Sequence, residues 1–203
     1  MTLRLAVLLS GGGRTLLNLV DAIAAGRLDA EVPLVISSRR TAKGVGRARD
    51  AGLHVDVLRP RDFDDKAAFC ARQTQVITAA DVDLIIMAGY LLHYPVPTGW
   101  EGRVLNIHPS LLPKFGGQGM YGDRVHAAVL AARETESGCT VHVVDDDYDS
   151  GPVIAQSRVP VLADDDTDAL AARVFEAECR TFPEAIANHA ATLIEQGALS
   201  PRR

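Results

Sequence analysis

The sequence is poor in cysteine, has no excess of basic residues and contains no long apolar run, and each absence excludes a class of protein. Its three cysteines, Cys70, Cys139 and Cys179, are widely spaced and form no Cys-x-x-Cys pair. Neither a disulfide framework nor a zinc motif is therefore indicated. The net charge of −5 and the pI near 5.6 argue against a general nucleic-acid-binding protein, whose contact surface would be strongly basic. Local basic patches remain compatible with these values.

Signals for export and membrane insertion are also absent. No apolar run approaches the roughly 18 residues that a transmembrane helix usually needs. Residues 1–4 lead directly into an apolar strand, without the basic region, apolar stretch and small-residue cleavage site of a secretory signal. We therefore expect a cytoplasmic protein that acts on small molecules, with neither nucleic acid nor membrane as a partner. A homodimer is compatible with the sequence.

Hydrophobic residues make up 47% of the 203 residues, which suffices for a substantial core in one α/β domain over residues 1–203. Strand patterns cover residues 5–9, 32–36, 55–58, 83–89, 103–107, 139–144 and 153–161. Helical patterns cover residues 16–26, 42–51, 63–79, 125–132 and a long stretch from its predicted N-cap, Thr167, with an interruption near Pro183. This alternation predicts a doubly wound, mostly parallel, Rossmann-like sheet flanked by helices on both faces.

A glycine turn, Gly11–Gly13, follows the first predicted strand and precedes a helix. Such a turn directs backbone N–H groups and the positive end of a helix at one point, which favours an anion such as a phosphate. Arg14 and Thr15 add a charge and a hydroxyl group. A dinucleotide-binding G-x-G-x-x-G pattern would need glycine where Leu16 stands, and the Walker pattern is also missing. The turn fits a single phosphomonoester, or it serves only as a tight turn.

Arg39 and Arg40 follow the second predicted strand. At this place in a dinucleotide-binding fold, a basic residue accommodates the 2′-phosphate of NADP. An NADP-binding oxidoreductase is therefore an alternative hypothesis. It is weakened by the incomplete glycine pattern and by the fact that arginines in loops are commonly solvated.

Asn106 and His108 lie at the end of the predicted strand over residues 103–107, just before Pro109. Because side chains alternate along a strand, both point to one face while Ile107 points into the core. An amide can donate to a developing oxyanion, and an imidazole can carry a proton near neutral pH. The pair suits attack on a carbonyl-type carbon, although an isolated Asn-x-His pattern is more often structural.

Residues 145–149 include four aspartates. An EF-hand would need glycine where Ser150 stands and glutamate where Gln156 stands, so a calcium loop is excluded. Asp149 differs from its neighbours because the Ser-Gly-Pro turn that follows it directs its carboxylate. Beside His108, this carboxylate would stabilise the imidazolium and raise the pKa of the histidine above its reference value of about 6.5.

Four motifs, in this order, resemble those of the glycinamide ribonucleotide formyltransferases, the folate-dependent enzymes of purine synthesis. The motifs are Ser10–Gly13, Ala88–Tyr90, Asn106–Pro113 and Asp149–Pro152. The last two together are specific to the formyltransferase superfamily, and the glycine turn selects the member. Relatives that act on initiator tRNA, or that deformylate folate, carry an added domain that we do not expect within 203 residues.

The resemblance implies transfer of the formyl group of 10-formyltetrahydrofolate to the amine of glycinamide ribonucleotide, without a metal. It implies that Asn106 and protonated His108 stabilise the oxyanion, that His108 transfers a proton, and that Asp149 holds the imidazole and raises its pKa. The implied substrate contacts are Gly12, Gly13, Arg14, Thr15, Pro109 and Glu178. The implied folate contacts are Lys66, Leu91, Leu92, His93, Tyr94, Asn106, Asp145, Asp146, Asp147 and Tyr148. Residues 1–100 would form the phosphate-binding half, and residues 101–203 the catalytic and folate-binding half.

Some positions depart from the family pattern. Arg14 and Thr15 stand where many relatives have Ser-Asn, and residues 92–94 read Leu-His-Tyr where Arg-Ile-Leu is common. A formyltransferase acting on another small amine, such as an amino sugar, is a further alternative. We expect His126 and His142, on a helix and a strand, to be packed or surface residues rather than ligands.

Overall fold

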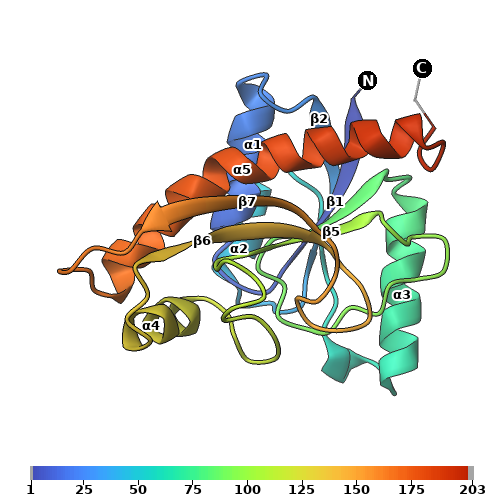
Figure 1. The fold of residues 1–203 in the computed structure, drawn as a ribbon. Coiled ribbons are helices and arrows are strands. Elements are labelled where there is room, and N and C mark those ends of the chain that lie inside the picture. Colours follow the sequence, from blue (N-terminus) through green and yellow to red (C-terminus); the bar gives the residue numbers. More distant parts are fainter. Residues whose placement is uncertain (1, 201–203) are drawn as a thin grey trace.

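The computed structural model describes residues 2–200 and shows an α/β fold built around a seven-stranded sheet (Figure 1). The strands are β1 (Leu3–Leu9), β2 (Ala30–Ser37), β3 (Val55–Val57), β4 (Leu84–Met87), β5 (Val104–His108), β6 (Glu136–Val143) and β7 (Val153–Pro160). Across the sheet they lie in the order β3-β2-β1-β4-β5-β6-β7. The pairs from β3 to β5 are parallel, whereas β6 is antiparallel to both β5 and β7. The predicted doubly wound, mostly parallel sheet is confirmed.

Helices cover both faces of the sheet. They are α1 (Arg14–Ala24), α2 (Lys43–Asp50), α3 (Lys66–Ala79), α4 (Asp123–Ala131) and α5 (Thr167–Glu195), with a short 3₁₀ helix, η1, at Pro60–Asp62. Helices α1, α2 and α5 contribute to the larger core cluster on one face, and α3 contributes to the smaller cluster on the other. The long helix α5 runs along β6 and β7 (Figure 1). Within residues 2–200, no helix is long and apolar enough to cross a membrane.

The alternation of side chains along β1 divides the core into these two clusters. Leu5, Val7 and Leu9 belong to the larger cluster, whereas Ala6 and Leu8 belong to the smaller one, and all five side chains are fully buried. A strand covered on both faces has no polar side to present to solvent, which explains why its sequence is a continuous apolar run.

Strand β5 follows the same rule and thereby sets the direction of the candidate residues. Leu105 and Ile107 pack into the larger cluster. Asn106 and His108 therefore point to the opposite face, at the carboxyl end of the strand. This confirms the prediction that they share one face. The site lies near the point where chain connections leave β1 and β4 in opposite directions, the usual ligand position in doubly wound sheets.

Three predicted details of the helices were wrong. Helix α3 begins at Lys66, after Asp65 accepts a hydrogen bond of 2.7 Å from the amide of Ala68 as the N-cap. The N-cap of α5 is Asp166, not Thr167, because the carboxylate of Asp166 accepts from the amide of Ala169 at 2.8 Å. Helix α5 also runs through Pro183 without a break. An aspartate accepts from the first turn at least as well as threonine does, and packing of α5 along the sheet overrides a single proline.

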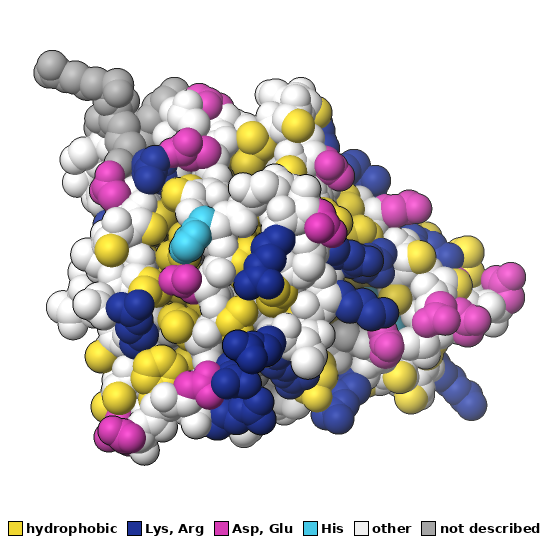
Figure 2. Space-filling view, turned by 180° about the vertical axis from the view of Figure 1, so that it is seen from behind, with side chains coloured by type: hydrophobic (Ala, Val, Ile, Leu, Met, Phe, Trp, Pro, Cys, Tyr) yellow, Lys and Arg dark blue, Asp and Glu magenta, His cyan; other side chains and the backbone are white. Residues whose placement is uncertain are grey.

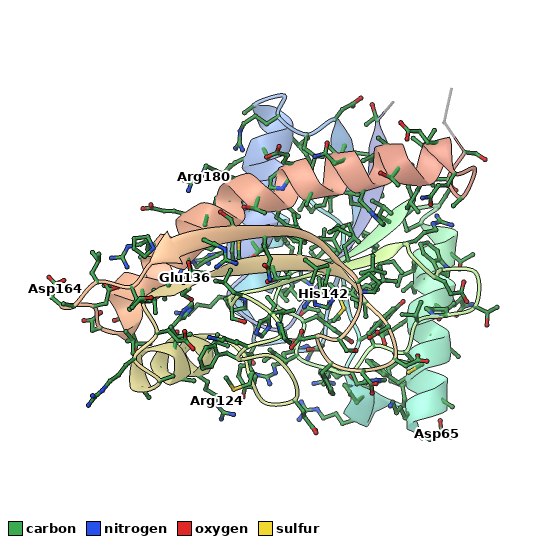
Figure 3. All side chains as sticks on the ribbon, in the orientation of Figure 1. Asp65, Arg124, Glu136, His142, Asp164 and Arg180 are labelled. Carbon is green, nitrogen blue, oxygen red and sulfur yellow. The ribbon has the colours of Figure 1, made fainter. Side chains whose placement is uncertain are left out.

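The surface carries basic patches although the net charge is negative. The back of the molecule, seen in Figure 2, shows several groups of Lys and Arg side chains among scattered Asp and Glu. Among the side chains labelled in Figure 3, His142 lies in the middle of the molecule, whereas Arg124 and Asp164 lie at its periphery.

Candidate active site

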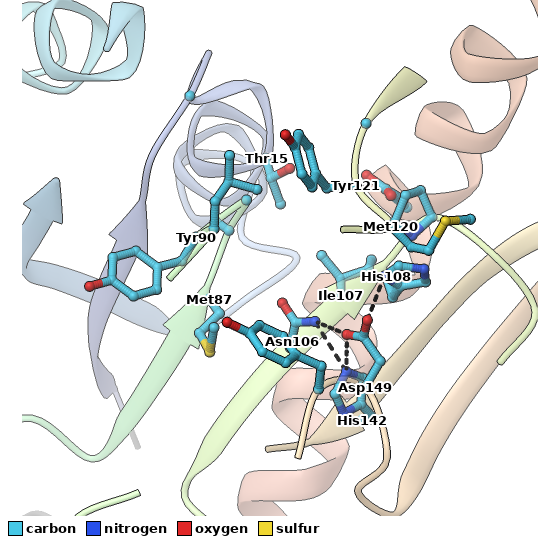
Figure 4. A pocket seen from close by; sticks show the side chains of 18 of the residues that line it. Thr15, Met87, Tyr90, Asn106, Ile107, His108, Met120, Tyr121, His142 and Asp149 are labelled. Atoms are coloured by element: carbon cyan, nitrogen blue, oxygen red, sulfur yellow. Dashed lines mark hydrogen bonds and ion pairs between the residues drawn. The ribbon is translucent and has the colours of Figure 1, made fainter. Parts of the chain in front are cut away.

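A cavity of about 560 Å³ lies at the carboxyl ends of β1, β4 and β5 (Figure 4). It is bounded by the glycine turn after β1, the segment after β4, the end of β5, the loop before α4, the loop between β6 and β7, and one face of α5. The predicted site residues that line it are Gly12, Gly13, Arg14, Thr15, Leu91, Leu92, His93, Tyr94, Asn106, His108, Pro109, Asp145, Asp147, Tyr148, Asp149 and Glu178. Segments far apart in the sequence therefore form one site. Of the predicted residues, all within the described part of the chain, Lys66 and Asp146 lie outside this lining.

Asn106 is oriented by two acceptors. Its amide nitrogen Nδ2 lies 3.1 Å from Nε2 of His142 and 3.3 Å from Oδ1 of Asp149, and these two acceptor atoms are themselves 3.4 Å apart. The three atoms form a nearly equilateral triangle, so both acceptors lie on the same side of the nitrogen. The two N–H bonds of a planar amide point about 120° apart. One N–H therefore serves this pair, and the other is directed elsewhere and can donate to a ligand.

His108 has an oxygen atom close to each ring nitrogen and is only 4% exposed. Its Nε2 lies 2.8 Å from the carbonyl oxygen of Phe115, which can only accept, so Nε2 carries hydrogen and donates. Its Nδ1 lies 3.4 Å from Oδ2 of Asp149. In the neutral ring, Nδ1 is therefore the basic nitrogen. A proton bound there would be held beside the Asp149 carboxylate.

Burial decides the protonation of His108. It lowers the pKa of the imidazole, and the charge of Asp149 together with the carbonyl of Phe115 raises it only in part. The net pKa of His108 lies below its ordinary value of 6.5, so the expectation of a raised pKa was wrong in sign. The carboxylate acts in the predicted direction, but desolvation of the charged ring outweighs it. The resting ring is consequently a neutral base at neutral pH.

Asp149 is the centre of this cluster. Burial raises the pKa of its carboxyl group. His142, His108 and the amide of Gly117 together lower this pKa by more than burial raises it, so the net pKa is below its ordinary value of 3.8. The Gly117 amide donates to Oδ2 at 2.9 Å. Asp149 therefore stays ionised near neutral pH and holds His108, Asn106 and the loop before α4 in one arrangement.

The glycine turn has the geometry of an anion site. Gly13 is the N-cap of α1 in the left-handed region, at φ 73°, and no side chain caps this helix. The free N–H groups of the first turn and the positive end of the helix therefore face the cavity. Arg14 lies with its guanidinium carbon 3.9 Å from the centre of the Phe175 ring. This stacking places a cation beside the turn.

Glu178 lies across from the glycine turn on α5 and is only 8% exposed. Burial raises the pKa of its carboxyl group to about 7, and the nearby charge of Arg14 opposes the shift. A half-protonated carboxyl group can both donate and accept hydrogen bonds, which suits the hydroxyl groups of a sugar.

The segment after β4 is joined to the loop between β6 and β7. Nε2 of His93 donates to the carbonyl oxygen of Asp146 at 2.8 Å, and the His93 ring meets the Tyr148 ring edge to face, with centres 5.4 Å apart. Tyr94 is buried, and its hydroxyl group has no hydrogen-bond partner within residues 2–200. Leu91 adds apolar surface. This wall of the cavity suits a flat ring with polar edges.

His142 is a site residue that the sequence did not reveal. We expected a packed or surface residue, and His142 is packed, at 2% exposure, but it also contacts Asn106 and Asp149. Its Nδ1 donates to the carbonyl of Val143 at 3.0 Å, so Nε2 accepts from Asn106 in the neutral ring. The pairing of β5 with β6 places it directly opposite Asn106. His126 is buried too and lines the cavity.

Fold and site together define a doubly wound α/β protein in which the cluster of Asn106, His108 and Asp149 and the glycine turn before α1 line a single cavity. Such a cavity suits group transfer at a carbonyl-type carbon. The sequence pattern of the formyl transferase family matches residues 3–186, and the chain belongs to this family.

Relatives and solved structures agree with this assignment. The chain is 44% identical over 188 residues to the trifunctional purine biosynthetic protein adenosine-3 of Drosophila melanogaster. The matched region covers 91% of this chain but only 14% of the Drosophila protein. It is 36% identical over 183 residues to phosphoribosylglycinamide formyltransferase of Escherichia coli strain K12, with 89% of this chain and 84% of the other covered. The crystal structure of glycinamide ribonucleotide transformylase 1 from Symbiobacterium toebii superposes with a TM-score of 0.87 at 37% identity, covering 94% of this chain and 89% of that one.

Proposed function

We propose that this chain is a phosphoribosylglycinamide formyltransferase, which transfers the formyl group of 10-formyltetrahydrofolate to the amine of glycinamide ribonucleotide in purine biosynthesis. The observation that carries the proposal is the single cavity that joins the glycine turn to the cluster of Asn106, His108 and Asp149. The names of the relatives from Escherichia coli and Symbiobacterium toebii support the same reaction.

The cavity offers each substrate a fitting surface. The phosphate of the nucleotide would bind at Gly12, Gly13, Arg14 and Thr15, the ribose at Glu178 and the glycinamide arm beside Pro109. The folate would bind along the wall formed by Leu91, Leu92, His93, Tyr94, Asp145, Asp147 and Tyr148, with Asp146 beside it through its contact with His93. Lys66, at the start of α3 and outside the cavity lining, stays a weaker candidate for a folate contact. Residues 1–100 would thus supply the phosphate site, and residues 101–203 the catalytic centre and most of the folate site.

The catalytic cluster would act on the formyl group as follows. The formyl carbon of the folate is the electrophile, and the neutral amine of the nucleotide forms the new C–N bond. The N–H of Asn106 that is directed away from His142 and Asp149 donates to the formyl oxygen as negative charge develops. Nδ1 of His108 accepts the proton that the amine loses and returns it to the departing folate nitrogen. Asp149 stabilises the imidazolium in between. No metal is needed for these steps.

The low pKa of His108 fits this role. A neutral imidazole can remove a proton from the attacking amine, and the protonated ring, paired with Asp149, can then act as the acid. The oxyanion stabilisation expected from an imidazolium would accordingly arise after the amine has attacked. Asn106 is the donor that is present from the start.

The test is an assay of the purified chain with both substrates. We expect formation of tetrahydrofolate and formylglycinamide ribonucleotide, with His108→Ala as the inactive control. A parallel reaction with an amino sugar in place of the nucleotide tests the alternative amine. Turnover of the amino sugar alone would contradict the proposed substrate. Cytoplasmic location and a homodimer stay predictions, to be tested by cell fractionation and sedimentation.

A further inference from the structure

Arg47 contacts the glycine turn, Gly11–Gly13, on the side that faces α2 and not the cavity. It lies on α2, far from the turn in sequence, and its guanidinium Nη1 donates to the carbonyl oxygen of Gly12 at 2.7 Å. One turn earlier on the same helix, the amide of Gly44 donates to the carbonyl oxygen of Gly11 at 3.0 Å. Two consecutive carbonyl groups of the turn are therefore tied to α2.

These two bonds decide where the N–H groups of the turn point. In a trans peptide the N–H lies opposite the C=O. When the carbonyls of Gly11 and Gly12 face α2, the N–H groups of Gly12 and Gly13 face the other way, toward the cavity that these glycines line. The orientation of the anion site thus depends on contacts made outside the cavity.

The close approach of α2 leaves the turn little freedom. A Cβ added to Gly13 would lie 2.6 Å from Cα of Gly44, and one added to Gly44 would lie 3.0 Å from the carbonyl oxygen of Gly11. Arg47 is bound to the one carbonyl of the pair that lacks a backbone donor from α2. A cation on the C=O of a peptide also polarises it and strengthens its N–H as a donor.

We propose that Arg47 is a positioning residue for the phosphate of the nucleotide substrate and acts through the Gly12–Gly13 peptide. Its guanidinium orients this peptide and makes the N–H of Gly13 a stronger donor, without touching the phosphate itself. The inference rests on the proposed function for the identity of the substrate. Because the Arg47 side chain is exposed, we assign it an effect on substrate binding and only a small effect on stability.

The experiment compares three variants in the formyl transfer assay. For Arg47→Ala we expect the KM for glycinamide ribonucleotide to rise about tenfold with kcat nearly unchanged, since a charge-assisted hydrogen bond is worth about this factor. Arg47→Lys, which keeps a cationic donor, should recover part of the loss. Arg49→Ala removes the same charge from the same helix and should leave KM near that of the wild type. Equal effects of Arg47→Ala and Arg49→Ala would overturn the proposal in favour of general electrostatic attraction.

A substrate without the phosphate isolates the interaction. With glycinamide ribonucleoside, the wild type and Arg47→Ala should show the same kcat/KM, because the phosphate that Arg47 serves is missing. An equal loss on both substrates would overturn the proposal and show a merely structural role. If the wild type shows no turnover of glycinamide ribonucleotide itself, the proposed function fails. The inference is then decided by calorimetric titration with inorganic phosphate, which should bind more weakly to Arg47→Ala and would overturn the inference by binding equally to both.

Discussion

The carboxylate of Asp149 contacts four groups of the candidate active site. Its two oxygens face Asn106 and His108 on β5, His142 on β6 and the amide of Gly117 in the loop before α4. The charge of Asp149 raises the pKa of His108 against the stronger lowering effect of burial. It also holds the N–H of Asn106 in place. Removing this charge should therefore change both the rate and its pH dependence.

We expect Asp149→Asn to lower kcat by about 10²–10⁴-fold, the usual contribution of general acid–base catalysis. Without the carboxylate, only the Phe115 carbonyl opposes burial, so the pKa of His108 falls further. The limb of the pH–rate profile that reports His108 should move to lower pH. Kinetics over a range of pH test this, with Asp164→Asn as a control at the periphery. A full-rate variant, or an unshifted limb, would contradict the assigned pair.

Glu178 provides a second test at the residue scale, through stability. Its pKa of about 7 in the folded protein lies above the ordinary 4.5. Below both values the carboxyl group is protonated in the folded and the unfolded chain and contributes nothing. As the pH rises from 4.5 to about 7, the unfolded chain releases this proton while the folded protein keeps it, so stability falls across this range and the full loss is reached above pH 7.

Glu178→Gln removes this titration while keeping the size of the side chain. Relative to the wild type, the variant should gain up to about 3 kcal/mol at alkaline pH, which is the free energy of a shift of this size. Near pH 4, below both pKa values, the two proteins should be nearly equal. Urea unfolding at both pH values measures the difference, with the exposed Glu184→Gln as the control. A gain that does not change with pH would contradict the buried charge.

At the scale of elements, the glycine turn and α2 behave as one unit. Gly13 has a positive φ of 73° and lies against the backbone of Gly44. We expect Gly13→Ala to destabilise the protein by more than the roughly 1–2 kcal/mol that a left-handed residue with a Cβ costs. It should also weaken binding of glycinamide ribonucleotide, since α1 and α2 must separate.

Gly52→Ala is a matched control for this variant. Gly52 has a similar φ of 76°, but a Cβ there meets nothing within 4 Å. The Gly52→Ala variant should therefore show only the cost of the backbone strain and bind glycinamide ribonucleotide as the wild type does. Thermal unfolding and calorimetry of both variants separate strain from contact. Equal behaviour of the two alanine variants would show that the approach of α2 has no consequence.

The remaining elements show which features local sequence patterns predict and which they do not. Strands β1 and β4 were predicted because buried strands are continuous apolar runs, and both lie in the centre of the sheet. The start of α5 was displaced by one residue, because Asp166 and Thr167 can both cap a helix and only the geometry of the first turn chooses between them. Pro183 lies within α5 because that helix is held by the sheet along its length.

At the scale of the molecule, the proposed site lies between the two halves of the chain and should couple ligand binding to global stability. We expect a folate analogue to raise the melting temperature, with a stabilisation of about 2.7 kcal/mol at a hundredfold excess over its Kd. NADP should give no such shift. Thermal unfolding with each ligand measures this. A shift with NADP alone would favour the alternative of a dinucleotide-binding protein, which Arg39 and Arg40 suggested.

The sequence by itself determined the alternating elements, the common face of Asn106 and His108, and the glycine turn before a helix, because these depend on periodicity and on residues that are neighbours in the chain. Only the tertiary structure decided that His142 lies opposite Asn106, through the antiparallel register of β6. It also decided that Arg47 supports the turn, and that burial outweighs Asp149 in the pKa of His108. Desolvation and contacts between distant segments arise from packing in three dimensions, which no local pattern contains.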